Sequence, residues 1–310
     1  MRYSEFLRKL KPWMLPLAML CGLLFHNAIE AVAFLTPWLI FAMLFITFCR
    51  LEPKKMRITG LSLSLLAVQL GGAVAVYLAL LPVSGDVAQG AFICVFCPTA
   101  TAAPVITGML GGNISRLATF SLVSNMAVAV TAPAAFTLMG TTEIDFAESV
   151  CTIALRVLPL ILGPLVTALV LKGVAPSVHR RISSSQSIGF YLWAVSLIIV
   201  VGRAVSFVMK EPPSRIPELV ALALVAGVVC IVQFVAGRRI GRRYGDRIAG
   251  AQGLGQKNTV LAIWMALTYL NPVTSVAPAA YIAWQNTINS LQIYLKQKRE
   301  NCKLNSSPER

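Results

Sequence analysis

The sequence predicts an all-α membrane protein in which ten transmembrane helices form two inverted repeats of five helices. Three observations support this prediction: the composition, a series of long apolar segments, and two interrupted segments at matching positions in the two halves of the chain. Of the 310 residues, 57% are hydrophobic and only 13% are charged, whereas a soluble domain usually carries about 25% charged residues. The composition therefore excludes a soluble globular enzyme and a disordered chain.

Ten apolar segments follow one another along the chain, separated by short loops. They cover residues 13–27, 31–49, 58–82, 87–110, 115–139, 146–171, 187–208, 216–237, 247–269 and 273–295. Each segment is expected to be helical, because lipid cannot satisfy free backbone groups and the runs are too long for barrel strands. The first segment follows a basic stretch, as a signal peptide does, but no A-x-A cleavage site comes after it. We interpret it as a retained span.

The lysines and arginines are distributed unevenly over the predicted loops. With a cytoplasmic N-terminus, the outer loops hold only Arg203, Lys210 and Arg215, and most of the other basic residues fall in inner loops. The largest inner group is Arg238, Arg239, Arg242, Arg243 and Arg247. This asymmetry follows the positive-inside rule, so we expect a multi-pass protein of the cell (inner or plasma) membrane with both termini in the cytoplasm. It also explains the net charge of +15 without nucleic acid as a partner.

Two of the ten segments are interrupted by their own residues. The fourth contains Pro98 and Pro104, and proline removes a backbone donor and clashes with the preceding helical turn. The ninth contains three glycines between Gly250 and Gly255 and then several polar residues. The two breaks lie half a chain length apart, and each falls in the fourth of five segments. Because five is an odd number, the second half is expected to insert upside down relative to the first.

We therefore predict one membrane domain built from two inverted repeats, residues 1–142 with spans one to five and residues 143–310 with spans six to ten. Paired interrupted helices in inverted halves are typical of secondary transporters, with the binding site near the membrane midplane. The alternative is two unrelated kinks, since glycine and proline are frequent in membrane helices.

Polar side chains gather in the two breaks and in the neighbouring segments. They are Gln69 in the third segment, Thr99, Thr101 and Thr107 in the fourth, Ser121, Ser124 and Asn125 in the fifth, Gln252, Gln256, Lys257, Asn258 and Thr259 in the ninth, and Gln285, Asn286, Thr287 and Asn289 in the tenth. Any one of these is more often an interhelical hydrogen-bonding residue than a ligand, but together they are typical of a lined cavity. No carboxylate falls in the centre of a span, where a proton relay or a sodium site would be expected to use one.

Lys257 lies well inside the ninth segment and is the main candidate for a functional residue. An ammonium at the midplane costs at least about 2.5–3.5 kcal/mol, so it needs compensation. Carbonyls of the ninth-segment break, together with Gln69, could hold it where a free cation would otherwise bind. It could instead lose its proton, face an anionic substrate, or extend to the cytoplasm as an edge lysine does. Arg156, in the sixth segment, is equally open to a structural and a cavity-facing role.

The cysteines do not indicate a metal or redox site. Cys94 and Cys97 form a CxxC, but the chain has only two histidines and no second CxxC, so we interpret the cysteines as small packing residues. We expect no metal, no cofactor and no enzymatic activity, because the spans contain neither paired carboxylates nor a nucleophile with a base.

With these residues the sequence resembles the bile acid:sodium symporter family. The likeness is clearest over residues 97–133, with Cys-Pro, small and Thr residues and a Gly-Asn turn, and over residues 253–291. The resemblance implies that helices three to five and eight to ten form a core, that helices one, two, six and seven form a panel, and that helices four and nine unwind and cross. It also implies an organic anion as substrate, a bile acid or a smaller carboxylate, which most members carry with two sodium ions.

Carried over residue by residue, the resemblance assigns substrate contacts to Thr101, Asn258, Gln285 and Asn286. Gln285 stands where the family has a histidine.

The family's sodium ligands are altered in this chain. A Ser-Asn pair is replaced by Ala103-Pro104, a Glu by Gly253, and the Gln of the second sodium site by Lys257, whereas Gln69 and Ser121 match retained ligands. We therefore expect an ion site or tethered cation formed by Lys257, Gln69, Gln256 and Ser121, with sodium doubtful as a bound ion.

The predicted function is secondary active or facilitative transport of organic anions by alternating access, independent of sodium. Two alternatives remain: a sodium-coupled bile acid symporter with divergent sites, and a membrane receptor that binds the same ligands without moving them. The lipid bilayer is the other expected partner, and the oligomeric state is left open.

Overall fold

The computed structural model describes residues 14–49, 57–100, 103–139, 146–184, 186–210 and 212–305, and throughout these ranges the regular elements are helices. They are α2 (Met14–Leu24), α3 (His26–Ile29), η2 (Glu30–Leu35), α4 (Thr36–Cys49), α5 (Gly60–Leu80), α6 (Gly85–Phe96), α7 (Ala103–Leu110), α8 (Ile114–Met139), α9 (Phe146–Val174), α10 (Pro176–Ser184), α11 (Gln186–Val208), η4 (Pro213–Arg215), α12 (Ile216–Arg243), α13 (Arg247–Gly255), α14 (Thr259–Tyr269), η5 (Pro272–Ser275) and α15 (Val276–Asn305). The all-α prediction is confirmed for this part of the chain.

Both predicted interruptions are present. The fourth apolar range divides into α6 and α7, and the ninth divides into α13 and α14. The loop expected between the first two ranges, residues 28–30, is helical instead, because it falls within the short helices α3 and η2. No proline or glycine occurs within residues 26–35, so nothing in the local sequence prevents helical turns there.

Four stretches of the described residues are long and apolar enough to cross a membrane. They are His26–Cys49, Gly60–Leu80, Ile114–Met139 and Pro213–Arg243. The architecture is thus that of a helical, multi-pass membrane protein. The full set of ten spans and the inverted repeat remain predictions, and the predicted boundary between the halves, at residues 142 and 143, lies outside the described residues.

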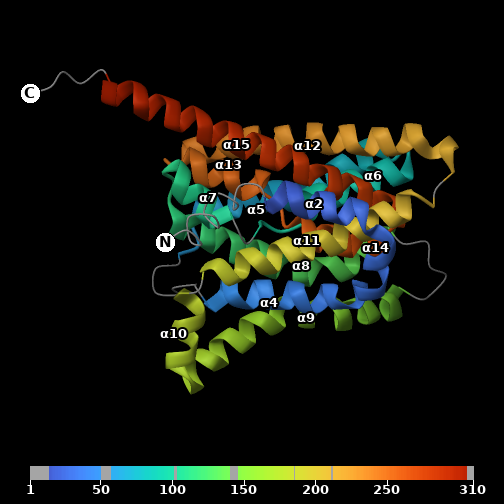
Figure 1. Cartoon of the computed structure of the whole chain (residues 1–310), viewed down its shortest axis with the longest axis horizontal. Coiled ribbons are helices and arrows are strands. Elements are labelled where there is room, and N and C mark those ends of the chain that lie inside the picture. Colours follow the sequence, from blue (N-terminus) through green and yellow to red (C-terminus); the bar gives the residue numbers. More distant parts are fainter. Residues whose placement is uncertain are drawn as a thin grey trace, which may run out of the picture.

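The long helices lie side by side along the longest axis of the molecule (Figure 1). α12 lies along one edge of this view and α9 along the other, while the short helix α10 turns away at one end. Large apolar side chains are exposed on the helices at these edges: Leu155, Val166 and Val170 on α9, and Leu224, Val228 and Ile231 on α12. Apolar outward faces of this kind suit contact with lipid chains.

A chain of aromatic rings connects the first half of the broken fourth segment to its neighbours. Phe92 and Phe96 of α6 stack with ring centroids 4.8 Å apart. Phe96 meets Phe136 of α8 edge-on at 6.0 Å, and Phe136 stacks on Tyr269, the last residue of α14, at 5.3 Å. Because such ring pairs prefer particular relative orientations, they fix α6 against both α8 and α14.

Close packing of α12 on α13 depends on glycine. A Cβ atom added at Gly237 would overlap the carbonyl oxygen of Gly250, and one added at Gly250 would overlap that of Gly237. Gly241 makes a similar approach to the start of α13. Small residues let membrane helices approach backbone to backbone, so these glycines set the position of α13 and of the break that follows it.

We expect Gly237→Ala to lower the thermal stability of the purified protein, because the backbones of α12 and α13 must separate to admit the methyl group. The cost should be about 1–3 kcal/mol. Gly71→Ala is the matched control, since Gly71 is also helical and a Cβ atom added there would meet no heavy atom within 4 Å. Equal melting temperatures for the two variants would contradict the proposed role of the α12–α13 contact.

Candidate functional site

The two interrupted segments cross and pair through their extended residues. The amide of Ala100 donates to the carbonyl of Gln256 at 2.9 Å, and the amide of Asn258 donates to the carbonyl of Pro98 at 2.8 Å. Between these bonds, Thr99 and Lys257 face each other in an antiparallel bridge. Pro98 explains the local geometry, because the residue before a proline avoids the helical region and Cys97 accordingly has φ −56° and ψ 143°.

Lys257 is buried at the end of α6. Its side chain is 1% exposed, and its Nζ donates to the carbonyl oxygen of Val95 at 2.7 Å. The last four carbonyls of a helix lack intrahelical partners, and they form the negative end of the helix dipole. The ammonium therefore lies where this half-helix attracts a cation. Among the described residues, the ion pairs lie elsewhere and none involves Lys257.

Gln69 of α5 satisfies the next two carbonyls of the same helix end. Its Nε2 donates to the carbonyl of Phe96 at 2.7 Å and to that of Cys97 at 3.2 Å, while its Oε1 accepts from the hydroxyl of Ser124 on α8 at 2.8 Å. Lys257 and Gln69 thus satisfy three consecutive carbonyls. The sequence predicted that Gln69 and carbonyls of the ninth segment would hold Lys257, and this is wrong. The carbonyl that accepts from Lys257 belongs to Val95 in the fourth segment, and Gln69 binds the two carbonyls that follow.

The carbonyls of the ninth-segment break have other partners, which is the physical reason for that difference. The hydroxyl of Thr99 donates to the carbonyl of Gly253 at 2.8 Å, and the hydroxyl of Tyr281 on α15 donates to that of Gly255, also at 2.8 Å. The capping is therefore reciprocal. Lys257, from the ninth segment, caps α6, and Thr99, from the fourth segment, caps α13.

Asn258 and Gln285, both predicted to contact substrate, are part of the crossing. The Oδ1 of Asn258 accepts from the amide of Leu261 at 3.3 Å and so caps the start of α14. The Oε1 of Gln285 accepts from the amide of Lys257 at 2.9 Å, and the Gln285 side chain is 2% exposed. Both residues therefore hold the backbone around Lys257 in position. Asn286, the next residue on α15, is half-buried.

The remaining predicted site residues are Gln256, Ser121, Thr101 and Arg156. Gln256 is buried, and its Oε1 has no hydrogen-bond partner within the described part of the structure. Ser121 is buried on α8, where its carbonyl accepts from the side chain of Asn125. Thr101 lies outside the described residues, and so does the side chain of Arg156.

Two residues of the crossing region have no counterpart in the sequence prediction. Tyr281 caps α13, and Gln233 of α12 donates both to the Tyr281 hydroxyl, at 3.0 Å, and to the carbonyl of Cys94, at 3.2 Å. Gln233 is a polar residue within a long apolar run, the same signal that drew attention to Gln69. Cys97 donates its thiol proton to the carbonyl of Asn258 at 3.2 Å, which fits the packing role expected for the cysteines.

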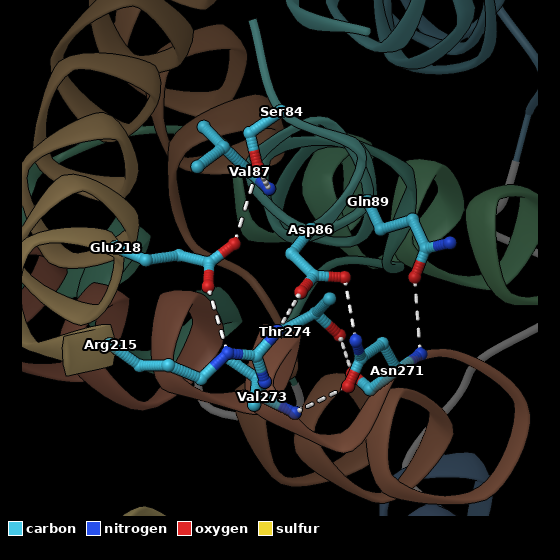
Figure 2. Close-up of polar contacts among 9 residues, drawn as sticks. All are labelled: Ser84, Asp86, Val87, Gln89, Arg215, Glu218, Asn271, Val273 and Thr274. Carbon is cyan, nitrogen blue, oxygen red and sulfur yellow. Dashed lines mark hydrogen bonds and ion pairs between the residues drawn. The ribbon is translucent and has the colours of Figure 1, made fainter. Parts of the chain in front are cut away.

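A polar cluster holds the start of α6, at the end of the helix away from the break (Figure 2). Asp86 accepts from Nη2 of Arg215 at 3.1 Å and from Nδ2 of Asn271 at 2.7 Å. Glu218 pairs with Nε of Arg215 at 3.3 Å, and Gln89 accepts from the amide of Asn271 at 3.1 Å. The cluster connects α6 to the start of α12 and to the turn between α14 and η5.

A second carboxylate holds the start of α13 in a comparable way. Asp246 caps this helix through the amide of Ala249 at 2.9 Å and accepts from the amide of Asn113, in the turn before α8, at 3.0 Å. Asp86 and Asp246 each connect the start of one half-helix to the turn that follows the other segment's second half. The sequence shows that these carboxylates lie at span ends, but it gives no sign of this shared role.

Comparison with known proteins gives no identity for the chain: no protein-family model and no curated sequence matches it. The likeness to the bile acid:sodium symporter family therefore depends on the motif residues alone.

Thr99→Val tests the reciprocal capping with almost no change in shape. The variant leaves the buried carbonyl of Gly253 without the hydroxyl, so we expect it to lose about 1–3 kcal/mol of stability. Thr131→Val is the matched control, because the Thr131 hydroxyl donates to Ala127 within its own helix and its loss should change stability by less than about 0.5 kcal/mol. Thermal unfolding in the same detergent measures the stability of both variants. If Thr99→Val is as stable as Thr131→Val, the capping of α13 by Thr99 is contradicted.

Proposed function

We propose that the protein is a secondary transporter of organic anions that works by alternating access and uses Lys257 as a tethered cation in place of sodium. The observation that carries this proposal is the buried Nζ of Lys257 on the carbonyl of Val95, at the open end of a broken helix. The resemblance to bile acid:sodium symporters supports the substrate class, a bile acid or a smaller carboxylate.

The two broken helices support a transporter over a channel or an enzyme. Broken helices provide amide groups for anions and carbonyls for cations at the membrane midplane. Here the carbonyls at the end of α6 are occupied by Lys257 and Gln69, and those at the end of α13 by Thr99 and Tyr281. The amide end of α14 is partly capped by the side chain of Asn258, so the proposed place for an anionic group is the start of α7.

A sodium-coupled symporter is the second candidate, and one observation favours it. The side-chain oxygens of Asn125 and Gln256 are buried without a hydrogen-bond partner among the described residues. An unpartnered buried oxygen is costly, and a bound sodium ion would satisfy it. A receptor that binds the same anions without moving them is the third candidate.

Transport in proteoliposomes distinguishes these three candidates. We expect counterflow of a labelled bile acid or monocarboxylate to proceed at the same rate when choline replaces sodium, because the cation position is occupied by a side chain. Uptake that collapses in choline would favour the sodium-coupled symporter. Binding in a thermal-shift assay without counterflow of any bound anion would favour the receptor.

Lys257→Gln tests the tethered cation directly. Removing the ammonium should lower sodium-free counterflow by at least about tenfold, since it removes a charge at a helix terminus and the donor for a buried carbonyl. It should also make counterflow respond to sodium, because the vacated position can then take a mobile cation. Lys210→Gln is the control, since Lys210 pairs with Glu30 at the surface. If Lys257→Gln changes neither transport nor thermal stability, the lysine has no role.

A further inference from the structure

The outward face of α12 changes from apolar to cationic along a single stripe. Leu224, Val228, Ile231 and Val235 are 59%, 61%, 52% and 42% exposed. With 3.6 residues per turn, the same stripe continues through Arg238, Arg239 and Arg242, all of which are exposed. The helix thus presents three guanidinium groups directly beyond a surface that suits contact with lipid chains.

These arginines cannot turn inward, because the opposite face of α12 is packed on α13. Gly237 and Gly241 lie on that opposite face and approach the backbone of α13 too closely to admit a side chain. The arginines therefore project away from the protein.

The side chains of Arg238, Arg239 and Arg242 make no hydrogen bond or ion pair within the described part of the chain. Three other cations at helix ends have partners within the protein. Arg215 pairs with Asp86, Arg116 donates to the carbonyl of Tyr244 at 3.0 Å, and Lys296 donates to that of Met109 at 2.8 Å. The three guanidinium groups on α12 are therefore available to a partner outside the chain.

We propose that Arg238, Arg239 and Arg242 bind the phosphate headgroup of an anionic phospholipid whose acyl chains lie along the Leu224–Val235 stripe. The guanidinium group matches the geometry of phosphate and can donate two parallel hydrogen bonds to it. Arg238 lies three residues, about 4.5 Å along the helix axis, beyond Val235, which is within the reach of a headgroup when the acyl chains contact the apolar stripe.

A lipid fits this surface better than the other possible occupants. Free phosphate would engage the arginines but would leave the apolar stripe without a partner. A second copy of the chain, docked through the same face, would bring like charges together at a cost. An anionic phospholipid matches the apolar stripe and the cationic end at once.

A headgroup bound there would act on the helix that supports the crossing. α12 is held to α13 through Gly237 and Gly250, and α13 leads directly into Gln256 and Lys257. An anionic lipid would therefore stabilise the core on which the candidate site depends. This inference depends on the membrane placement of α12 and not on transport.

The test uses the full chain in nanodiscs made of phosphatidylcholine, with or without phosphatidylglycerol. We expect phosphatidylglycerol to raise the melting temperature of the wild type by roughly 3 °C, and native mass spectrometry to detect retained phosphatidylglycerol. The triple variant Arg238→Gln/Arg239→Gln/Arg242→Gln should lose most of this rise and retain at least about tenfold less lipid. Soluble inorganic phosphate, added to phosphatidylcholine nanodiscs, should not reproduce the rise.

The matched control removes the same number of charges elsewhere. Arg57, Lys172 and Arg180 are exposed basic residues elsewhere in the chain, and their triple replacement by Gln should keep the response to phosphatidylglycerol. Equal losses in the two triple variants would show general surface electrostatics and overturn the proposal. A rise with free phosphate alone would overturn it too. A variant with lysine at the three positions keeps the charge and so controls for loss of folding. Its lipid retention should still fall, because lysine cannot form the paired hydrogen bonds of arginine.

Discussion

A helix broken inside an apolar interior leaves carbonyl and amide groups that only the protein itself can satisfy. Lipid offers no hydrogen bonds, and each unpaired group costs several kcal/mol. At the end of α6, the chain meets this constraint with the ammonium of Lys257 and the amide of Gln69. At the end of α13 it uses the hydroxyls of Thr99 and Tyr281. The positions of the surrounding side chains follow from this requirement.

The capping is reciprocal, and so the two breaks depend on each other. Thr99 and Lys257 face each other in the bridge, and each caps the half-helix of the opposite segment. Neither segment can change its extended conformation without removing a cap from the other. The outer supports are also distributed between the segments, because Asp86 and Asp246 connect the far ends of α6 and α13 to turns elsewhere in the chain. Side chains thus hold α6 and α13 at both of their ends. Glycine packing against α12 also holds α13 along its length.

The sequence predicts the local features well, since prolines and glycines act on their own neighbours. The breaks after Phe96 and Gly255 follow from Pro98 and the glycine run, and the helical ranges follow from the apolar segments. The partners could not be predicted from the residues alone. Which carbonyl receives Lys257, and which carbonyls Gln69 satisfies, depend on contacts between residues far apart in the chain. Asp86 and Asp246 were recognisable only as carboxylates at span ends, because their shared role needs the packed structure.

A cation that is part of the chain has consequences that a mobile ion does not have. A bound sodium ion can enter on one side of a membrane and leave on the other, so its gradient can drive transport. The ammonium of Lys257 is covalently attached, so it can balance the carbonyl dipoles at the end of α6 but cannot carry energy from a sodium gradient. Under the proposed function, the driving force must then come from the substrate's own gradient, from exchange, or from a proton gained and lost by Lys257 itself. The same side chain that keeps the broken helices together would thus determine which energy sources the transporter can use.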